Sequence, residues 1–366
     1  MPAGSARRIV LGLVLAALTA GGVAVGQEEP APSRQDARAP GRRPVELEEV
    51  TVTASPIVEG NEVDLFASMK TVVARSQLED LNAQDLGTAL RRTPGVTLSR
   101  YNPIGSFGGG EGGAVFIRGM GSSRPGGEIK MLIDGVPMYM SVWNHPLLDL
   151  MSIDAAGAVE VYKSPQPQHF GNAFGVVNLV PKRRETEGFR TRVETAVGCF
   201  ETMVGTAEHG GRVGAFDYLV GGGWRRSDGH RTDADGRLAD GYGTVGYRLS
   251  DVWELRLFTL WTDNRARDPG PEGAPPEERK GIYDTSAWLS TFTLAHETDQ
   301  AEGFVKLFRN AGTGDWLRQP TATPGVTEDL FNDFCFYGLR AREALRLWAG
   351  GEVVAGLDWD FTRGDW

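Results

Sequence analysis

The sequence has little cysteine, little histidine and no excess of positive charge. Its 366 residues include only Cys199 and Cys335, which are too few and too far apart for a disulfide framework or a zinc site. We interpret them as unpaired small apolar residues in strands. The net charge of -10 argues against a nucleic-acid binder, which would need a basic stripe. Beyond the N-terminus no run of 18 apolar residues occurs, so a membrane-embedded mature chain must be a barrel.

Signatures of catalysis are missing as well. The sequence contains no nucleophile elbow, P-loop or zinc-binding histidine pair, and its five histidines are scattered. The glycine-rich stretch 108–113 is not followed by a helical pattern, which leaves a phosphate site unsupported. We therefore expect no enzyme activity and no cofactor.

Two patterns raise the question of a bound metal. Asp233-Ala234-Asp235-Gly236 resembles part of a calcium loop but lacks the remaining ligand positions, so we favour a solvated loop. Soft side chains that could suit copper also gather in one region, although methionine more often fills gaps in a core. These residues are Met120, Met131, Met138, Met140 and His145. We expect no metal site.

The N-terminus has the layout of a secretory signal peptide. Arg7 and Arg8 are followed by a short apolar run, Ile9 to Ala20, and then by small residues up to Gly26. A membrane anchor is the alternative, but the apolar run is too short to span a bilayer comfortably. Residues 1–26 are therefore predicted to be a signal peptide.

A linker and a small α+β domain are predicted next. Residues 27–47 carry almost no large apolar side chains, and the β-prone stretch 48–55 within the 27–59 linker suits strand addition to a partner's sheet edge. Between residues 60 and 183, Ser76 to Arg92 has helical spacing and ends at Thr93-Pro94-Gly95. The predicted strands are Val96–Leu98, Ala114–Arg118, Ile129–Ile133, Ala158–Tyr162 and Val176–Val180.

From about residue 184 to residue 366 the pattern changes to alternating segments. In Phe216, Tyr218, Val220, Gly222 and Trp224 one face is apolar with an aromatic residue at each end, as in a transmembrane β-barrel. We count about nine strands, joined alternately by short turns and long polar loops. A soluble β-sandwich also alternates, but it has no reason to sort its loops in this way. Because an open edge is not viable in lipid, we expect this antiparallel barrel to be incomplete and the sequence to be a piece of a longer protein.

Several motifs together make the chain resemble the TonB-dependent outer-membrane receptors. They occur in that family's order across about 130 residues, and together they are specific although each alone is weak. The motifs are Glu49-Val50-Thr51-Val52-Thr53-Ala54, Leu90-Arg91-Arg92-Thr93-Pro94-Gly95-Val96, Phe116-Ile117-Arg118-Gly119-Met120-Gly121, Leu132-Ile133-Asp134-Gly135-Val136-Pro137 and Val159-Glu160-Val161-Tyr162-Lys163.

The resemblance implies a plug domain at residues 60–183 followed by the N-terminal part of a transmembrane barrel. It implies transport of a scarce nutrient, such as siderophore-bound iron, haem, cobalamin or a similar metal complex, across the outer membrane of a Gram-negative bacterium. The implied partners are TonB with its ExbB/ExbD complex, outer-membrane lipid and the substrate, and no nucleic acid. The plug and N-terminus would face the periplasm. A secreted or surface β-rich binding protein, an adhesin or lectin, is the alternative.

The resemblance also assigns roles to individual residues. The segment Glu49, Val50, Thr51, Val52, Thr53 and Ala54 would be the TonB-binding handle. The plug motif residues are Ile117, Arg118, Gly119, Ile133, Asp134, Gly135, Val136 and Pro137. We expect Arg118 to face the barrel wall or a plug carboxylate, and the Asp134-Gly135 turn to present residues 136–145 to the substrate side. The candidate substrate contacts are Tyr101, Asn102, Phe107, Arg124, Met138, Tyr139, Trp143 and His145.

Overall fold

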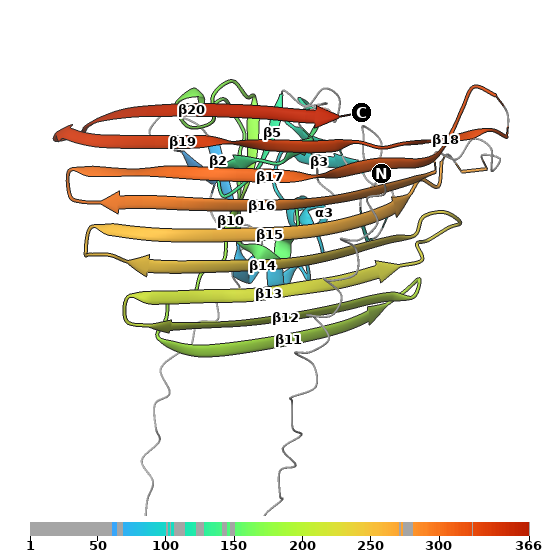
Figure 1. Cartoon of the computed structure of the whole chain (residues 1–366), viewed down its shortest axis with the longest axis horizontal. Coiled ribbons are helices and arrows are strands. Elements are labelled where there is room, and N and C mark those ends of the chain that lie inside the picture. Colours follow the sequence, from blue (N-terminus) through green and yellow to red (C-terminus); the bar gives the residue numbers. More distant parts are fainter. Residues whose placement is uncertain are drawn as a thin grey trace, which may run out of the picture. The chain divides into compact units, whose positions relative to one another are not determined.

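The computed structural model shows a small mixed domain against a large antiparallel sheet (Figure 1). It describes residues 61–63, 69–99, 102, 104–105, 114–121, 128–140, 145–146, 151–270, 272–273, 281–323 and 325–365. These residues belong to one compact unit, Ala54–Trp366. The predicted signal peptide, linker and TonB-binding handle lie outside the described residues. No helix in the described part of the chain combines the length and the hydropathy needed to cross a membrane.

The N-terminal domain is built on a six-stranded sheet with the order β1-β2-β9-β10-β5-β6. Two further hairpins, β3-β4 and β7-β8, form separate two-stranded sheets. The elements are β1 (Asn61–Val63), β2 (Met69–Ala74), α2 (Arg75–Asp80), α3 (Leu86–Leu90), β3 (Val96–Ser99), β4 (Ala114–Ile117), β5 (Ile129–Ile133), β6 (Val136–Pro137), β7 (Tyr139–Met140), β8 (His145–Pro146), η3 (Ile153–Ala155), β9 (Ala156–Tyr162), α4 (Pro167–Phe170) and β10 (Gly175–Pro181). The predicted α+β character is confirmed.

The helix predicted over Ser76–Arg92 is two short helices, α2 and α3. Asn82 adopts a left-handed backbone with φ of 47°, which ends the first helix. Asp85 then caps the second, because its Oδ1 accepts a hydrogen bond from the amide of Thr88 at 2.7 Å. The apolar spacing was sound nonetheless, since Leu78 and Leu90 are both buried in the core. Spacing alone did not reveal the cap between them.

Nine long strands form the large sheet in sequence order, as predicted, and a short tenth strand, β18, pairs with β17. In the described residues β11 and β20 each have one neighbour, so the sheet is not closed into a barrel. The strands are β11 (Gly188–Gly198), β12 (Thr202–Val213), β13 (Phe216–Ser227), β14 (Gly236–Arg248), β15 (Trp253–Arg267), β16 (Ile282–Glu297), β17 (Ala301–Pro320), β18 (Thr327–Leu330), β19 (Asp333–Trp348) and β20 (Gly351–Asp365).

The connections sort to two ends of this sheet. Turns of a few residues at 214–215, 249–252, 298–300 and 349–350 define what we call the short-turn end, at the left in Figure 1. The connections 228–235, 268–281 and 321–332 define the long-loop end, at the right. The β11–β12 turn is also at the long-loop end; it contains Cys199, which we had expected in a strand. Sorted loops of this kind are typical of outer-membrane barrels.

The two faces of the sheet differ in chemistry. On β13 the side chains of Phe216, Val220 and Trp224 are exposed, whereas Asp217 and Arg225 on the opposite face are buried. Phe216 and Trp224 are eight residues apart, which is about 26 Å along a strand and close to the height of the apolar band of a membrane barrel. The predicted alternation is therefore confirmed, with the apolar face outward.

The main apolar cluster joins the two parts of the chain. It contains side chains from the small domain, such as Ile117, Val159 and Val177, and side chains from the inward face of the sheet, such as Leu289 and Phe336. Burying apolar surface in this way fastens the domain to the sheet at roughly 25 cal/mol per Å². The domain thus packs on the inward face, and that interface is where the polar contacts of interest lie.

Candidate functional site

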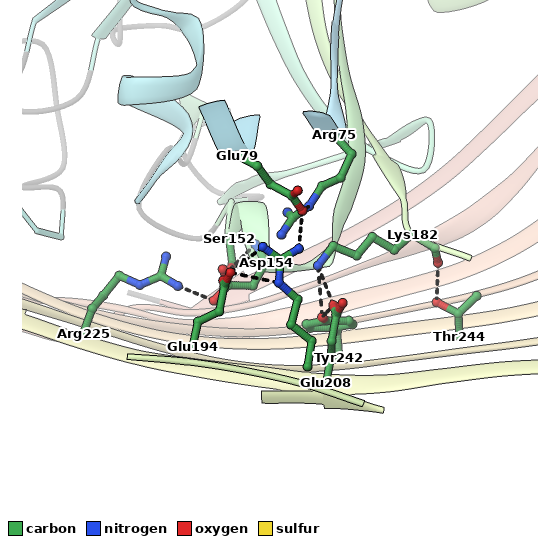
Figure 2. Close-up of polar contacts among 11 residues, drawn as sticks. Arg75, Glu79, Ser152, Asp154, Lys182, Glu194, Glu208, Arg225, Tyr242 and Thr244 are labelled. Atoms are coloured by element: carbon green, nitrogen blue, oxygen red, sulfur yellow. Dashed lines mark hydrogen bonds and ion pairs between the residues drawn. The ribbon is translucent and has the colours of Figure 1, made fainter. Parts of the chain in front are cut away.

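Charged side chains gather where the small domain meets strands β11 to β14 (Figure 2). The domain contributes Arg75 and Glu79 from α2, Asp154 from η3 and Lys182 from the residue after β10. The sheet contributes inward-facing residues from four neighbouring strands. We call the whole set the interface network: Arg75, Glu79, Asp154, Lys182, Arg192, Glu194, Glu208, Arg225 and Tyr242.

Arg225 and Asp154 form the most deeply buried ion pair of this network. The Arg225 side chain is 1% exposed and that of Asp154 is 14% exposed. The second guanidinium nitrogen of Arg225 donates to the backbone carbonyl of Gln84. Gly223 makes the close approach possible, because a Cβ at that position would overlap the Asp154 carboxylate. The side chain of Ser152 positions this turn by accepting a hydrogen bond from the Asp154 amide at 3.2 Å.

Lys182 makes the second connection between the domain and the sheet. Its Nζ lies 2.7 Å from Glu208 Oε2, and the Tyr242 hydroxyl donates to the same carboxylate oxygen at 2.9 Å. Thr244 Oγ1 donates to the Lys182 carbonyl at 3.1 Å. Burial lowers the pKa of Lys182, and the charge of Arg75 lowers it further, while Glu208 acts in the opposite direction. A cavity of about 10 Å³ beside these groups has room for about one water molecule.

Arg192 on β11 makes the third connection. Its guanidinium pairs with Glu79 of α2 and with Glu194 on its own strand. Glu79 also accepts from Arg75 Nε at 2.9 Å. Burial raises the pKa of Glu79, but the hydrogen bonds from Arg192 and Arg75 outweigh this effect and leave the pKa below its ordinary value. Glu79 is 37% exposed, so water moderates the strength of the pair.

A fourth connection lies across the interface at the Asp134-Gly135 turn. Both residues have left-handed backbones, with φ of 54° and 74°, so the predicted tight turn is confirmed. Asp134 Oδ1 lies 2.7 Å from Lys306 Nζ on β17, and its Oδ2 accepts from Thr291 Oγ1 on β16 at 2.7 Å. The turn therefore contacts the sheet directly.

A fifth connection involves Asn102. Its Nδ2 lies 3.1 Å from the carbonyl oxygen of Ala234, 3.3 Å from that of Asp235 and 2.9 Å from that of Arg267. These carbonyls stand just before β14 and at the end of β15, at the long-loop end of the sheet. Asn102 is 1% exposed, so its side chain contacts the sheet in this structure, and its contact with a substrate stays a prediction.

The structure separates the other predicted site residues into three groups. Ile117, Ile133, Val136 and Met138 are buried in the core, and the role of Met138 as a substrate contact stays a prediction. Pro137 is buried too, so the chain after the turn is not presented to solvent there. Tyr139 and His145 lie in the β7-β8 hairpin, where only the backbone is described. The residues outside the described part are Tyr101, Phe107, Arg124 and Trp143.

Arg118 does not follow its prediction in the described residues. It is exposed, has a left-handed backbone with φ of 52°, and directs Nη2 to the sulfur of Met69 at 3.8 Å. Among the described residues no carboxylate pairs with it, in contrast to our expectation. Gly119 follows it in the same turn with φ of 77°. The Arg118-Gly119 pair therefore serves here to reverse the chain after β4.

The Asp233-Ala234-Asp235 stretch is held by an arginine. Arg267 Nη1 lies 3.2 Å from Asp233 Oδ1, and its Nε lies 3.3 Å from Asp235 Oδ1. These carboxylates thus have a cationic partner in this structure. Met131, like Met138, is buried in the core, which agrees with the packing role that we favoured for both methionines.

Sequence reasoning missed the principal members of the interface network. No role was predicted for the side chains of Asp154, Lys182 or Arg225. A usable signal did exist on the strands, because Arg225 alternates with the outward residue Trp224 and so had to face inward. No comparable signal marked Asp154, which depends on the short turn η3 for its position.

Comparisons with known proteins agree with this geometry. A family model described as the TonB-dependent Receptor Plug Domain matches residues 65–177. Over 122 residues, or 32% of this chain and 18% of the relative, the chain is 29% identical to the vitamin B12 transporter BtuB of Vibrio vulnificus (strain CMCP6).

The fold is also similar to solved structures. FpvA of P. aeruginosa bound to heterologous pyoverdines has a TM-score of 0.62 and 16% identity, covering 81% of this chain and 42% of that one. The ferric preacinetobactin receptor BauA of Acinetobacter baumannii gives 0.62 and 16%, covering 81% and 47%. The copper transporter OprC gives 0.61 and 17%, covering 81% and 46%. The chain therefore spans less than half of these relatives.

Proposed function

We propose that this chain is the plug domain of a TonB-dependent receptor followed by part of such a receptor's β-barrel, and that it imports a scarce nutrient across the outer membrane. The plug would close the lumen in the resting state and move when TonB pulls on it. The short-turn end would face the periplasm and the long-loop end the outside, following the usual arrangement of these barrels.

The observation that carries the proposal is how the plug is fastened. Its contacts with the sheet include ion pairs and hydrogen bonds, among them Arg225–Asp154, Lys182–Glu208 and Lys306–Asp134. Such groups can exchange their partners for water when the plug moves, because water solvates charges well. A domain that must leave and return needs contacts of this kind. An adhesin or lectin, our alternative, has no need of a plug fastened inside its sheet.

Energy for this movement would come from the inner membrane through TonB and ExbB/ExbD. The segment Glu49–Ala54 would add as a strand to a sheet edge of TonB, and several main-chain hydrogen bonds would then bear the force together. The segment precedes β1, which pairs with β2 through only three residue pairs. Tension on the handle would thus reach the edge of the plug sheet first.

For the substrate we propose a metal complex too large for passive diffusion. The names of the similar proteins mention vitamin B12, pyoverdine, preacinetobactin and copper. For this chain we favour a ferric siderophore, haem, cobalamin or a similar complex. A bare copper ion is less suitable, since Met131 and Met138 are buried in the core rather than gathered at an accessible site.

The test is uptake by whole cells with and without TonB. Radiolabelled ferric siderophores, haemin and cyanocobalamin would each be offered to cells producing the complete receptor, its Val52→Pro variant or its Gln35→Pro variant. Proline at position 52 removes a main-chain donor from the handle, whereas position 35 lies in the linker and serves as the matched control. We expect Val52→Pro to bind a probe normally but to lose uptake to the level of cells without TonB.

Two outcomes would contradict the proposal. Normal uptake by Val52→Pro would show that the handle is assigned wrongly. Recovery of the complete protein as a water-soluble species on membrane fractionation would favour the secreted binding protein instead of the receptor.

A further inference from the structure

The β3-β4 hairpin is held in place differently from the rest of the plug. Its strands pair only with each other among the described residues and do not join the six-stranded plug sheet. Val115 and Ile117 of β4 bury their side chains in the core. The chain between the strands contains Asn102, Ile104 and Gly105, which contact the sheet. The position of the connecting end of the hairpin therefore depends on the contacts that these three residues make with the sheet.

Asn102 touches the backbones of two neighbouring barrel strands at once. Its amide nitrogen lies within 3.3 Å of carbonyl oxygens before β14 and at the end of β15. The Asp235 carbonyl also accepts a hydrogen bond from the Arg267 amide at 3.0 Å. Asn102 therefore adds a hydrogen bond beside the main-chain pairing of β14 with β15. The Asn102 amide nitrogen carries two N–H donors and so suits a group of carbonyl oxygens, whereas a carboxylate in its place would be repelled by them.

The plug backbone is also packed closely against the start of β14. A Cβ at Gly236 would overlap the carbonyl oxygen of Ile104, so the plug backbone lies directly on the start of β14. Gly105 has φ of 75° and sits against Asn264 and the Arg265 carbonyl. The Oδ1 atom of Asn102 is buried without a hydrogen-bond partner, and this unsatisfied acceptor lowers the net stability of the contact.

We propose that Asn102 is a positioning residue that latches the plug hairpin β3-β4 to the two loop segments 228–235 and 268–270. Both loops lead directly into the carbonyls that Asn102 contacts. Arg267 joins them further by pairing with Asp233 and Asp235. A ligand that moves either loop would then shift the hairpin without touching Asn102. This inference deepens the proposed function and rests on it, because a latch has a role only if the plug moves during import.

The experiment measures amide hydrogen exchange in the complete receptor, purified in detergent, with no ligand added. We expect Asn102→Asp, which keeps the side chain's size, to raise the exchange of β3 and β4 by about tenfold. Asn332→Ala is the matched control: Asn332 is also 1% exposed and donates to the Gly314 carbonyl at 2.9 Å, but it links barrel to barrel. It should leave β3 and β4 within about twofold of wild type.

A second comparison tests coupling rather than stability. Asp235→Asn weakens the ion pair between Asp235 and Arg267. With Asn102 intact, this change should raise the hydrogen exchange of β3 and β4. In the Asn102→Asp background it should cause no further increase. Gly236→Ala should mimic Asn102→Asp, because it displaces Ile104 while leaving the asparagine intact. Equal effects of Asp235→Asn in both backgrounds, or unchanged exchange in Asn102→Asp, would overturn the latch. Neither result depends on transport, so failure of the import proposal is detected separately.

Discussion

Removal of the Arg225 side-chain charge should loosen the plug at η3 more than any change on the outward face of the same strand. In Arg225→Met the Asp154 carboxylate stays largely buried and loses its partner. The nearby carboxyl group of Asp240, which interacts with both charges, loses the cation as well. Loss of one member of a buried pair costs about 3–5 kcal/mol; because Asp154 is 14% exposed, we take the lower value of about 3 kcal/mol.

This free energy corresponds to a roughly 100-fold increase in the open population of the η3 region. Hydrogen exchange of the backbone at Ile153–Tyr162 in the complete receptor would report it. Arg226→Met is the matched control, because Arg226 is 43% exposed on the opposite face and lies 3.9 Å from Glu201. We expect its effect to stay within about threefold. If the two variants exchange equally, the buried pair contributes no more than a surface pair, and the reasoning fails.

Two further changes test other connections. Lys306→Met leaves the Asp134 side chain with Thr291 as its remaining partner on the large sheet. Hydrogen exchange at the Asp134-Gly135 turn should then rise by about tenfold. A rise below about twofold would show that the Lys306–Asp134 contact does not hold the turn. Glu79 has a lowered pKa, so its contribution is present above the ordinary value of 4.5 and is lost as pH falls below it. Protection of α2 should therefore fall below about pH 4.5 in wild type and show a smaller fall in Glu79→Gln; equal falls would exclude this cause.

The fold was largely predictable because its signals are local and repeated. The strands from β11 to β20 alternate over many residues, and the sequence predicted the nine long ones and the sorting of their loops, but not the short β18. The helical pattern at Ser76–Arg92 placed Leu78 and Leu90 correctly in the core, but the cap at Asp85 divides it. A single capping hydrogen bond leaves no periodic trace in a sequence, which is why the division went unpredicted.

The candidate site was less predictable because it depends on contacts between residues distant in sequence. Asp134-Gly135 was correctly predicted as a turn, yet its role as a contact for Lys306 required the sheet's register. Asn102 was grouped with substrate contacts because it lies in a polar loop; the structure buries it against strands more than 130 residues away. Pairings of this kind are set by how the plug sits on the sheet, and no local pattern encodes that.

The polarity of the inward face of the sheet differs from strand to strand, and this difference predicts where the plug separates first. Strands β11 to β14 meet it with several charged residues, such as Arg192 and Glu208, whereas β16 to β19 meet it with the larger apolar side chains Leu289, Phe308 and Phe336 beside the Lys306–Asp134 pair. Water can replace the partners of the former, but exposing the latter costs about 25 cal/mol per Å². In a Cys199→Ser, Cys335→Ser background, Glu208→Cys should react with a small thiol reagent faster than Leu289→Cys, and TonB should increase the difference. Equal labelling at both positions would mean that the plug leaves as one body.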